Sequence, residues 1–266
     1  MTAPVPRTPQ VHDADAIARL RPLLVERVRG NSFDPATGYL DLMEGRRESL
    51  SPITVAMRMP LVSTIYERYW RPGFGRLLKG VNGPSMGDEY NLAAELMQLR
   101  PGSVALDLGC GPANFARRFA RTVGPAGLVV GYDGSETMLK RAVNELRRDP
   151  TRSLALCLGE ATVLPFEDNA FDSVCCFAAL HMFPDPFASL DEIVRVLGPG
   201  GRLALLTTRA PSGTGLRTTV VRAIGESSGQ KMFNRAQIRE ALESRGLHVE
   251  SQEPAGAAQI VSAVIR

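Results

Sequence analysis

The sequence has 266 residues, of which 44% are hydrophobic and 22% are charged. These proportions are typical of a globular protein of one or two domains, and they exclude a chain that is disordered throughout. Lys and Arg number 31 and Asp and Glu number 28, a net charge of only +3. The charge therefore does not indicate a nucleic-acid partner.

The start of the chain and its cysteines bear on location and metal binding. The first ten residues, MTAPVPRTPQ, lack the apolar run of a signal peptide, and no stretch approaches the ~18 apolar residues of a membrane span. The four cysteines, Cys110, Cys157, Cys175 and Cys176, form no CxxC pair. We therefore expect a cytoplasmic protein with reduced cysteines, no metal site and no membrane span.

The first hundred residues are predicted to be helical and rich in loops. Residues 1–10 are expected to be disordered. An amphipathic helix is expected over residues 11–28, kinked or split by Pro22, and a second apolar and aromatic stretch follows over residues 53–78. We predict that residues 11–100 form an N-terminal helical cap or lid. Exposed apolar and aromatic side chains on such a cap would be one route to a homodimer.

From residue 103 onward, short apolar runs alternate with helical patterns. The runs lie at residues 103–108, 128–132, 154–158, 171–177, 202–207, 247–251 and 259–265. This alternation is typical of βαβ units. We therefore predict an α/β domain over residues 101–266, with a Rossmann-like, seven-stranded, mostly parallel sheet and helices on both faces.

Two helices of this domain have recognisable starts and stops. Asp185 can cap a helix with Pro186 at its first position, and Gly198 follows the last apolar residue. Asn234 and Gln237 have the spacing of a capping box, which predicts a second helix start there.

A glycine-rich turn follows the first of these strands. Gly109 and Gly111 allow tight backbone geometry, and backbone N–H groups at the following helix start can bind a polar or anionic ligand. The turn alone is weak evidence, because position 114 is Asn where a dinucleotide fingerprint has a third glycine. Asp133 ends the second strand, where an acid can accept hydrogen bonds from ribose hydroxyls. Together these features predict an adenosine-containing ligand.

Several segments, in order and spacing, resemble the motifs of class I S-adenosyl-L-methionine (SAM) methyltransferases. They are Asp107–Pro112, Gly131–Met138, Gly159–Asp172, Ala178–Phe183 and Arg195–Gly201. The resemblance covers about Tyr66 to the C-terminus and is strongest to the ubiquinone/menaquinone-type and small-molecule methyltransferases. It implies SAM as the cofactor and in-line transfer of its methyl group to an O, N or C atom. The acceptor would be a small, largely apolar metabolite, such as a quinone, polyketide, terpenoid or indole.

The resemblance also implies a set of cofactor-binding residues. They are Tyr66, Asp107, Gly109, Cys110, Gly111, Asp133, Gly134, Met138, Glu160, Ala161 and Phe177. Each also has a plainer interpretation, as a tight turn, a carboxylate bonded to local backbone, a surface charge or a side chain packed in the core. The family often has Gly at position 113 and Asp at position 160. Ala113 is small enough for close approach, and Glu160 can reach the adenine amino group through a longer arm.

The acceptor side offers fewer signals. His181 follows the fourth strand and could be a general base, or a structural or substrate-orienting residue. The glycine-containing segment Arg209–Gln230 is expected to act as a lid over the acceptor.

Two alternatives to a small-molecule methyltransferase remain open. A nucleic-acid methyltransferase of the amino type is disfavoured, because Phe177–Met182 lacks the expected Asn/Asp-Pro-Pro-aromatic tetrapeptide. A SAM-binding protein without methyl transfer is the other alternative, since fold alone does not determine function.

Overall fold

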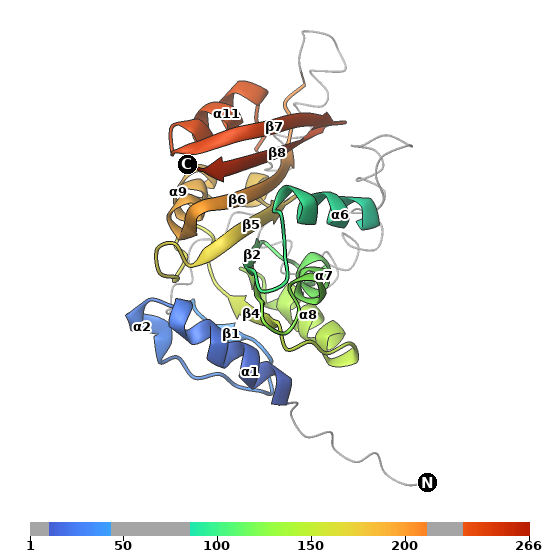
Figure 1. Ribbon diagram of the computed structural model, residues 1–266, viewed down its shortest axis with the longest axis vertical. Helices are drawn as coiled ribbons and strands as arrows, with labels where there is room; N and C mark the ends of the chain where they lie inside the picture. The colour runs from blue at the N-terminus through green and yellow to red at the C-terminus, as the bar shows by residue number, and fades with distance from the viewer. Residues whose placement is uncertain (1–10, 44–85, 212–230) are drawn as a thin grey trace.

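A computed structural model gives the structure of the protein and describes residues 11–43, 86–211 and 231–266 (Figure 1). Residues 1–10 and Tyr66 lie outside the described residues, as does most of the expected lid, residues 212–230. An eight-stranded sheet runs through the described part, in the order β1-β4-β3-β2-β5-β6-β8-β7. The α/β class predicted from the alternating pattern is confirmed.

Each predicted apolar run forms a strand. The strands are β1 (Leu40–Asp41), β2 (Val104–Leu108), β3 (Leu128–Asp133), β4 (Leu154–Leu158), β5 (Phe171–Phe177), β6 (Leu197–Thr208), β7 (Leu247–Ala255) and β8 (Ala258–Ile265). Pairing is parallel from β1 to β6, while β8 runs antiparallel to both β6 and β7. The predicted count of seven strands is wrong by one. The additional strand, β1, is only two residues long and has no periodic pattern that would reveal it.

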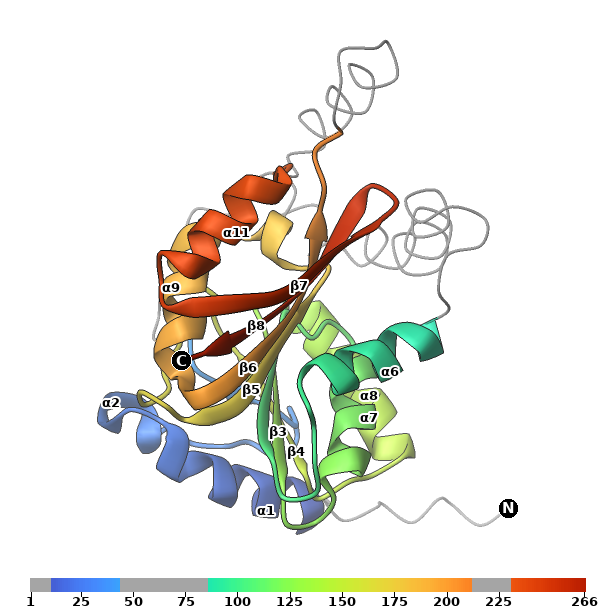
Figure 2. The same ribbon diagram turned by 45° about the horizontal axis from the view of Figure 1, so that its top comes forward.

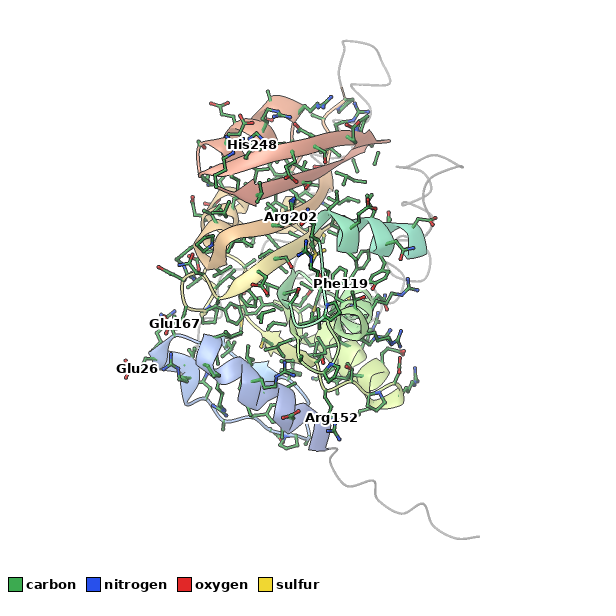
Figure 3. The ribbon with its side chains drawn as sticks, viewed as in Figure 1. Glu26, Phe119, Arg152, Glu167, Arg202 and His248 are labelled. Atoms are coloured by element: carbon green, nitrogen blue, oxygen red, sulfur yellow. The ribbon has the colours of Figure 1, made fainter. Side chains whose placement is uncertain are left out.

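Helices cover both faces of this sheet (Figure 2). They are α1 (Val11–Leu20), η1 (Arg21–Leu23), α2 (Glu26–Arg29), α6 (Met86–Leu96), α7 (Asn114–Val123), α8 (Glu136–Arg148), η3 (Leu180–Met182), α9 (Pro186–Val196) and α11 (Arg235–Glu243). The buried residues of α1, α9 and α11 join one hydrophobic cluster, and those of α6, α7 and α8 join another. Phe119 of α7 is fully buried in the second cluster (Figure 3). The central strands are therefore buried on both sides, which explains their nearly continuous apolar sequence.

The N-terminal residues pack directly on the sheet. Helix α1 contacts β3 and β4, and β1 pairs with β4. The chain changes from α-helix to a 3-10 turn at Arg21–Leu23, with Pro22 near its start, so the predicted split of this helix is confirmed. The division at residue 100 into a helical cap and an α/β domain stays a prediction.

Helix capping follows the predicted chemistry. The Asp185 carboxylate accepts hydrogen bonds from the backbone of Phe187 and Ala188, both at 3.0 Å, and so begins α9. Asn234 and Gln237 form both bonds of a capping box at the start of α11. No helix among the described residues is long and apolar enough to cross a membrane.

The strand order reverses at one position of the sheet. From β2 the chain proceeds outward through β3 to β4, and then returns to β5 on the other side of β2. Ligands of doubly wound sheets bind beyond the carboxyl ends of the strands at such a reversal. This edge carries the glycine-rich turn after β2, Asp133 at the end of β3, Glu160 after β4 and His181 after β5.

Candidate functional site

The glycine-rich turn after β2 is held by backbone hydrogen bonds to the neighbouring strand. Gly109 has φ +74° and Gly111 has φ +55°, in the left-handed region that favours glycine. The Gly109 amide donates to the carbonyl of Tyr132 at 2.8 Å, and the Gly111 amide donates to Asp133 Oδ2 at 2.7 Å. The turn is thus fixed to the end of β3 before any ligand binds.

Asp133 organises the end of β3 with both carboxylate oxygens. Oδ2 accepts from the Gly111 amide, and Oδ1 accepts from the Ser135 amide at 2.8 Å. The Ser135 side chain then caps α8 by accepting from the Met138 amide. A carboxylate has about four lone-pair sites, so it can accept more than two hydrogen bonds. Asp133 is half-buried, so its side chain is partly exposed at the carboxyl edge of the sheet.

Asp107 lies below the turn and is buried at 4% exposure. Its Oδ2 accepts a hydrogen bond from the Ala116 amide at 3.0 Å, which ties β2 to the first turn of α7. Ala113 precedes α7 in the left-handed conformation with φ 58°, and its side chain makes no capping bond. The start of α7 therefore presents its backbone at the turn rather than a side-chain cap.

The end of β4 lies beside the end of β3. The Gly159 amide donates to the Asp133 carbonyl at 3.1 Å, and the Tyr132 hydroxyl donates to the Glu160 carbonyl at 3.4 Å. A Cβ at Gly159 would lie 1.9 Å from the Tyr132 hydroxyl, so only glycine fits there. These contacts place Glu160 and buried Ala161 next to Asp133 at the same edge.

Some predicted cofactor residues direct their side chains into the protein. Cys110 is buried, and its thiol would lie 3.2 Å from a Cβ at Gly131. Burial raises the pKa of this thiol well above its usual value, and Asp133 adds to the effect. A cofactor contact from Cys110 would therefore come from its backbone. Met138 is also buried, in the first turns of α8.

Phe177 ends β5, on the other side of β2, and His181 follows this strand. Phe177 is half-buried, and its ring packs against Phe115 with centroids 5.6 Å apart. His181 lies in η3 and is 7% exposed, and its Nδ1 has no hydrogen-bond partner among the described residues. Burial lowers the pKa of His181 to about 4. The imidazole is therefore neutral at pH 7.

Sequence reasoning missed Arg195, which braces the loop after β4. Its guanidinium donates to the carbonyls of Leu164 and Phe166, both at 2.7 Å. Glu192 accepts from the Leu164 amide at 2.6 Å and pairs with Arg195 at 2.8 Å. The predicted motif contained Arg195, but only the fold brings it to this loop. Together the two side chains fix the segment that follows Glu160.

The residues at this edge fit a nucleoside-containing cofactor. A Cβ at Gly111 would meet no atom within 4 Å, so the turn faces open space. A half-buried carboxylate and the start of α7 border that space, as ribose hydroxyls and a polar ligand tail would require. Of the two remaining predicted cofactor residues, Gly134 directly follows the end of β3, and Tyr66 lies outside the described part of the chain. Within that part, no three His, Cys, Asp or Glu side chains are grouped to hold a metal ion.

Comparisons with known proteins agree with this geometry. Residues 106–205 match the family model described as a methyltransferase domain. A demethylmenaquinone methyltransferase of Bacillus cereus is 40% identical over 122 residues, which are 46% of this chain and 52% of that protein. The first curated relatives are matched over 43 to 52% of their own length, so the chain spans about half of each.

Solved structures share the fold. A SAM-dependent methyltransferase from Aquifex aeolicus superimposes with a TM-score of 0.56 at 21% identity, over 72% of this chain and 98% of that one. The 4+2 cyclase SpnF superimposes with a TM-score of 0.63 at 20% identity, over 82% of this chain and 97% of that one. At such identities these two matches establish the fold alone.

Proposed function

We propose that the protein is a class I SAM-dependent methyltransferase that transfers the methyl group of SAM to a small, largely apolar acceptor, on the premise that residues 106–205 match a methyltransferase domain and that the fold is shared with a SAM-dependent methyltransferase. The observation that carries this proposal is the arrangement of Asp133. Its carboxylate is half-buried beside the open glycine turn and bonded to the Gly111 and Ser135 amides. A ribose on Asp133 would direct the rest of SAM along this turn.

When bound, SAM supplies a methyl carbon on a positively charged sulfur, which leaves as a neutral thioether. The protein's part is to hold the donor and acceptor in line, about 3–3.5 Å apart, and to exclude water. The Gly109–Gly111 turn and the start of α7 would hold the methionine end. Asp133, Met138 and Glu160 would hold the ribose and adenine.

We further propose that His181 orients the acceptor. It follows β5 at the same edge, and its Nδ1 has no partner among the described residues. A neutral imidazole keeps one ring nitrogen that can accept a hydrogen bond from an acceptor hydroxyl or amine. Because burial lowers its pKa to about 4, the imidazole is a weak resting base.

The His181 proposal predicts a specific kinetic change. His181→Ala should lower kcat by about tenfold or more, because an acceptor that is no longer held in line reacts more slowly, while the Kd for S-adenosylhomocysteine stays unchanged. Single-turnover kinetics and isothermal titration measure the two quantities. An unchanged kcat would contradict the proposed role of His181. A Kd for S-adenosylhomocysteine that rises as kcat falls would show a general disturbance of the site.

The proposed acceptor class rests on two observations. Among the curated relatives, the Bacillus cereus protein is named for demethylmenaquinone, a quinone. The sequence has only a small net charge of +3, which provides little attraction for a nucleic acid. Mass spectrometry of reactions with a panel of quinones, phenols and indoles would identify the acceptor by its gain of one methyl group.

Isothermal titration tests the first requirement of the proposed function, which is cofactor binding. Wild-type protein should bind SAM and S-adenosylhomocysteine, and Asp133→Ala should weaken both by about 30-fold or more, because it removes charge-assisted hydrogen bonds to the ribose worth about 2–3 kcal/mol. Glu243→Gln is a matched control, since this carboxylate pairs with Arg239 on α11. It should bind like the wild type.

The outcomes separate the alternatives. Tight binding without any methylated product from the panel would favour a SAM-binding protein that catalyses no transfer. Salt-dependent binding of RNA or DNA with methylation of the nucleic acid would favour the other alternative. Absence of binding by the wild-type protein would contradict the proposal itself.

A further inference from the structure

Residues 21–43, here called the N-terminal arm, contact the loop that follows β4. Leu24 forms an antiparallel bridge with Phe166. The Val25 amide donates to the Pro165 carbonyl at 3.1 Å, and the Glu167 amide donates to the Leu23 carbonyl at 2.8 Å. The Arg29 guanidinium also pairs with Glu167 at 2.9 Å, and Figure 3 shows Glu167 beside the arm. The arm and Arg195 thus both contact this loop.

The arm also extends the sheet at the β4 edge. Leu40 lies opposite Cys157 and Asp41 lies opposite Leu158 in a parallel pair. The Leu42 amide continues the pairing with a 2.8 Å bond to the Leu158 carbonyl. The arm therefore runs toward the carboxyl end of β4, directly before Gly159 and Glu160.

Finally, the arm packs against α8. Gly38 has φ +76°, and a Cβ at this position would lie 2.7 Å from Val143, so the backbone itself rests on the helix. Tyr39 is 6% exposed, and its hydroxyl donates to Glu136 Oε1 at 2.9 Å. Arg147 donates to the Ala36 carbonyl at 2.8 Å from the other end of the helix.

The elements that the arm contacts are those proposed to hold adenosine. They are β4, the loop after it and the first turn of α8, yet the arm lies wholly outside the matched residues 106–205. We infer that the N-terminal arm supports the cofactor site and that Tyr39 is a positioning residue. Tyr39 would hold Glu136 in place, and with it the start of α8 that follows Asp133. This inference rests on the proposed function, because it concerns the same site.

The chemistry of the Tyr39 contact suits this role. A hydrogen bond from a hydroxyl to a carboxylate is charge-assisted and stronger than a neutral one. Glu136 is the first residue of α8, where a negative charge is favourable to the helix dipole. It lies three positions after Asp133 and two before Met138. A shift of this turn would therefore displace both Asp133 and Met138.

Tyr39→Phe tests the inference with the loss of one hydroxyl group. Isothermal titration of the full chain should show the Kd for S-adenosylhomocysteine raised about threefold to tenfold, since only part of the lost hydrogen bond is coupled to binding. The Kd for methylthioadenosine, which lacks the amino-acid end, should rise by the same factor. Equal factors would locate the effect at the adenosine portion that both ligands share rather than at the amino-acid end.

Tyr90→Phe is the matched control. The Tyr90 hydroxyl bonds to Thr122 at 2.5 Å and the Arg118 carbonyl at 3.2 Å, away from the proposed site. This variant should bind both ligands like the wild type. Glu136→Gln is a second test, because its side chain is 55% exposed and its replacement should leave the fold intact. It should raise both Kd values, and the double variant should show little further change.

The outcomes are distinguishable. If the wild type binds S-adenosylhomocysteine and both single variants bind it equally well, the role of the arm is overturned while the proposed function stands. If the wild type binds neither ligand, both are overturned. Weaker binding by Tyr39→Phe and Glu136→Gln, with Tyr90→Phe unchanged and effects that do not add, supports the inference.

Discussion

Two parts of the carboxyl edge of the sheet, the ends of β2 and β3 and the ends of β5 and β6, differ in how their polar groups are used. At β2 and β3, the carboxylates of Asp107 and Asp133 are bonded to backbone amides of the turn and helix starts. On the side of β5 and β6, His181 Nδ1 and Thr207 Oγ1 are buried without a hydrogen-bond partner among the described residues. Such groups are costly to leave unpaired.

This difference is informative about what each part does. A site whose polar groups are fixed by hydrogen bonds to one another is preorganised, which suits a ligand that is always the same, as a cofactor is. A part with unused hydrogen-bonding capacity suits a variable acceptor. The cofactor side could therefore be derived from a few motifs, whereas the acceptor is proposed only by class.

The glycine-rich turn joins the two parts, and Gly109→Ala should disrupt both. A Cβ at this position would lie 2.4 Å from the Ala179 Cβ, which follows β5. The positive φ adds strain, so we expect a loss of about 3 kcal/mol in the free energy of unfolding. Urea denaturation measures this loss, and a change below about 1 kcal/mol would show that the two parts are not packed as described.

Gly111→Ala provides the contrast. Its φ is also positive, but its Cβ would meet no atom within 4 Å. The expected loss of stability is only about 1 kcal/mol, from backbone strain alone. Its larger effect should be on the binding of S-adenosylhomocysteine, because the new methyl group would occupy the open space beside the turn. Wild-type affinity in this variant would place the cofactor elsewhere.

Acid should destabilise the β5 side through His181. Its pKa is lowered from 6.5 to about 4 by burial, so the unfolded chain binds this proton first as pH falls. The contribution is fully present above pH 6.5 and is lost between pH 6.5 and 4, with an upper limit of about 3 kcal/mol. Between pH 7 and 4, wild-type protein should lose more stability than His181→Gln. Equal losses in urea titrations at both pH values would contradict this burial.

Much of the fold could be predicted from the sequence because its signals are local. The capping groups Asp185 and Asn234 act within one turn of helix, and both predicted helix starts are confirmed. Strand β1 could not be predicted, because Leu40 and Asp41 pair only through tertiary contact with β4.

The candidate site was predictable to a similar extent. Asp133 and the glycines stand in a recognisable order along the chain. The bonds of Tyr39 to Glu136 and of Arg195 to Leu164 join residues 97 and 31 positions apart. Nothing in either local sequence indicates its partner, so such positioning contacts become visible only in the folded chain.

The central claim is that SAM binds across the carboxyl ends of β2 to β4 with its ribose on Asp133. A crystal structure of the full chain with S-adenosylhomocysteine tests it most directly. The account predicts both ribose hydroxyls within hydrogen-bond distance of the Asp133 carboxylate and the amino-acid end beside Gly109–Gly111. A ligand bound elsewhere, or a ribose that does not contact Asp133, would contradict it.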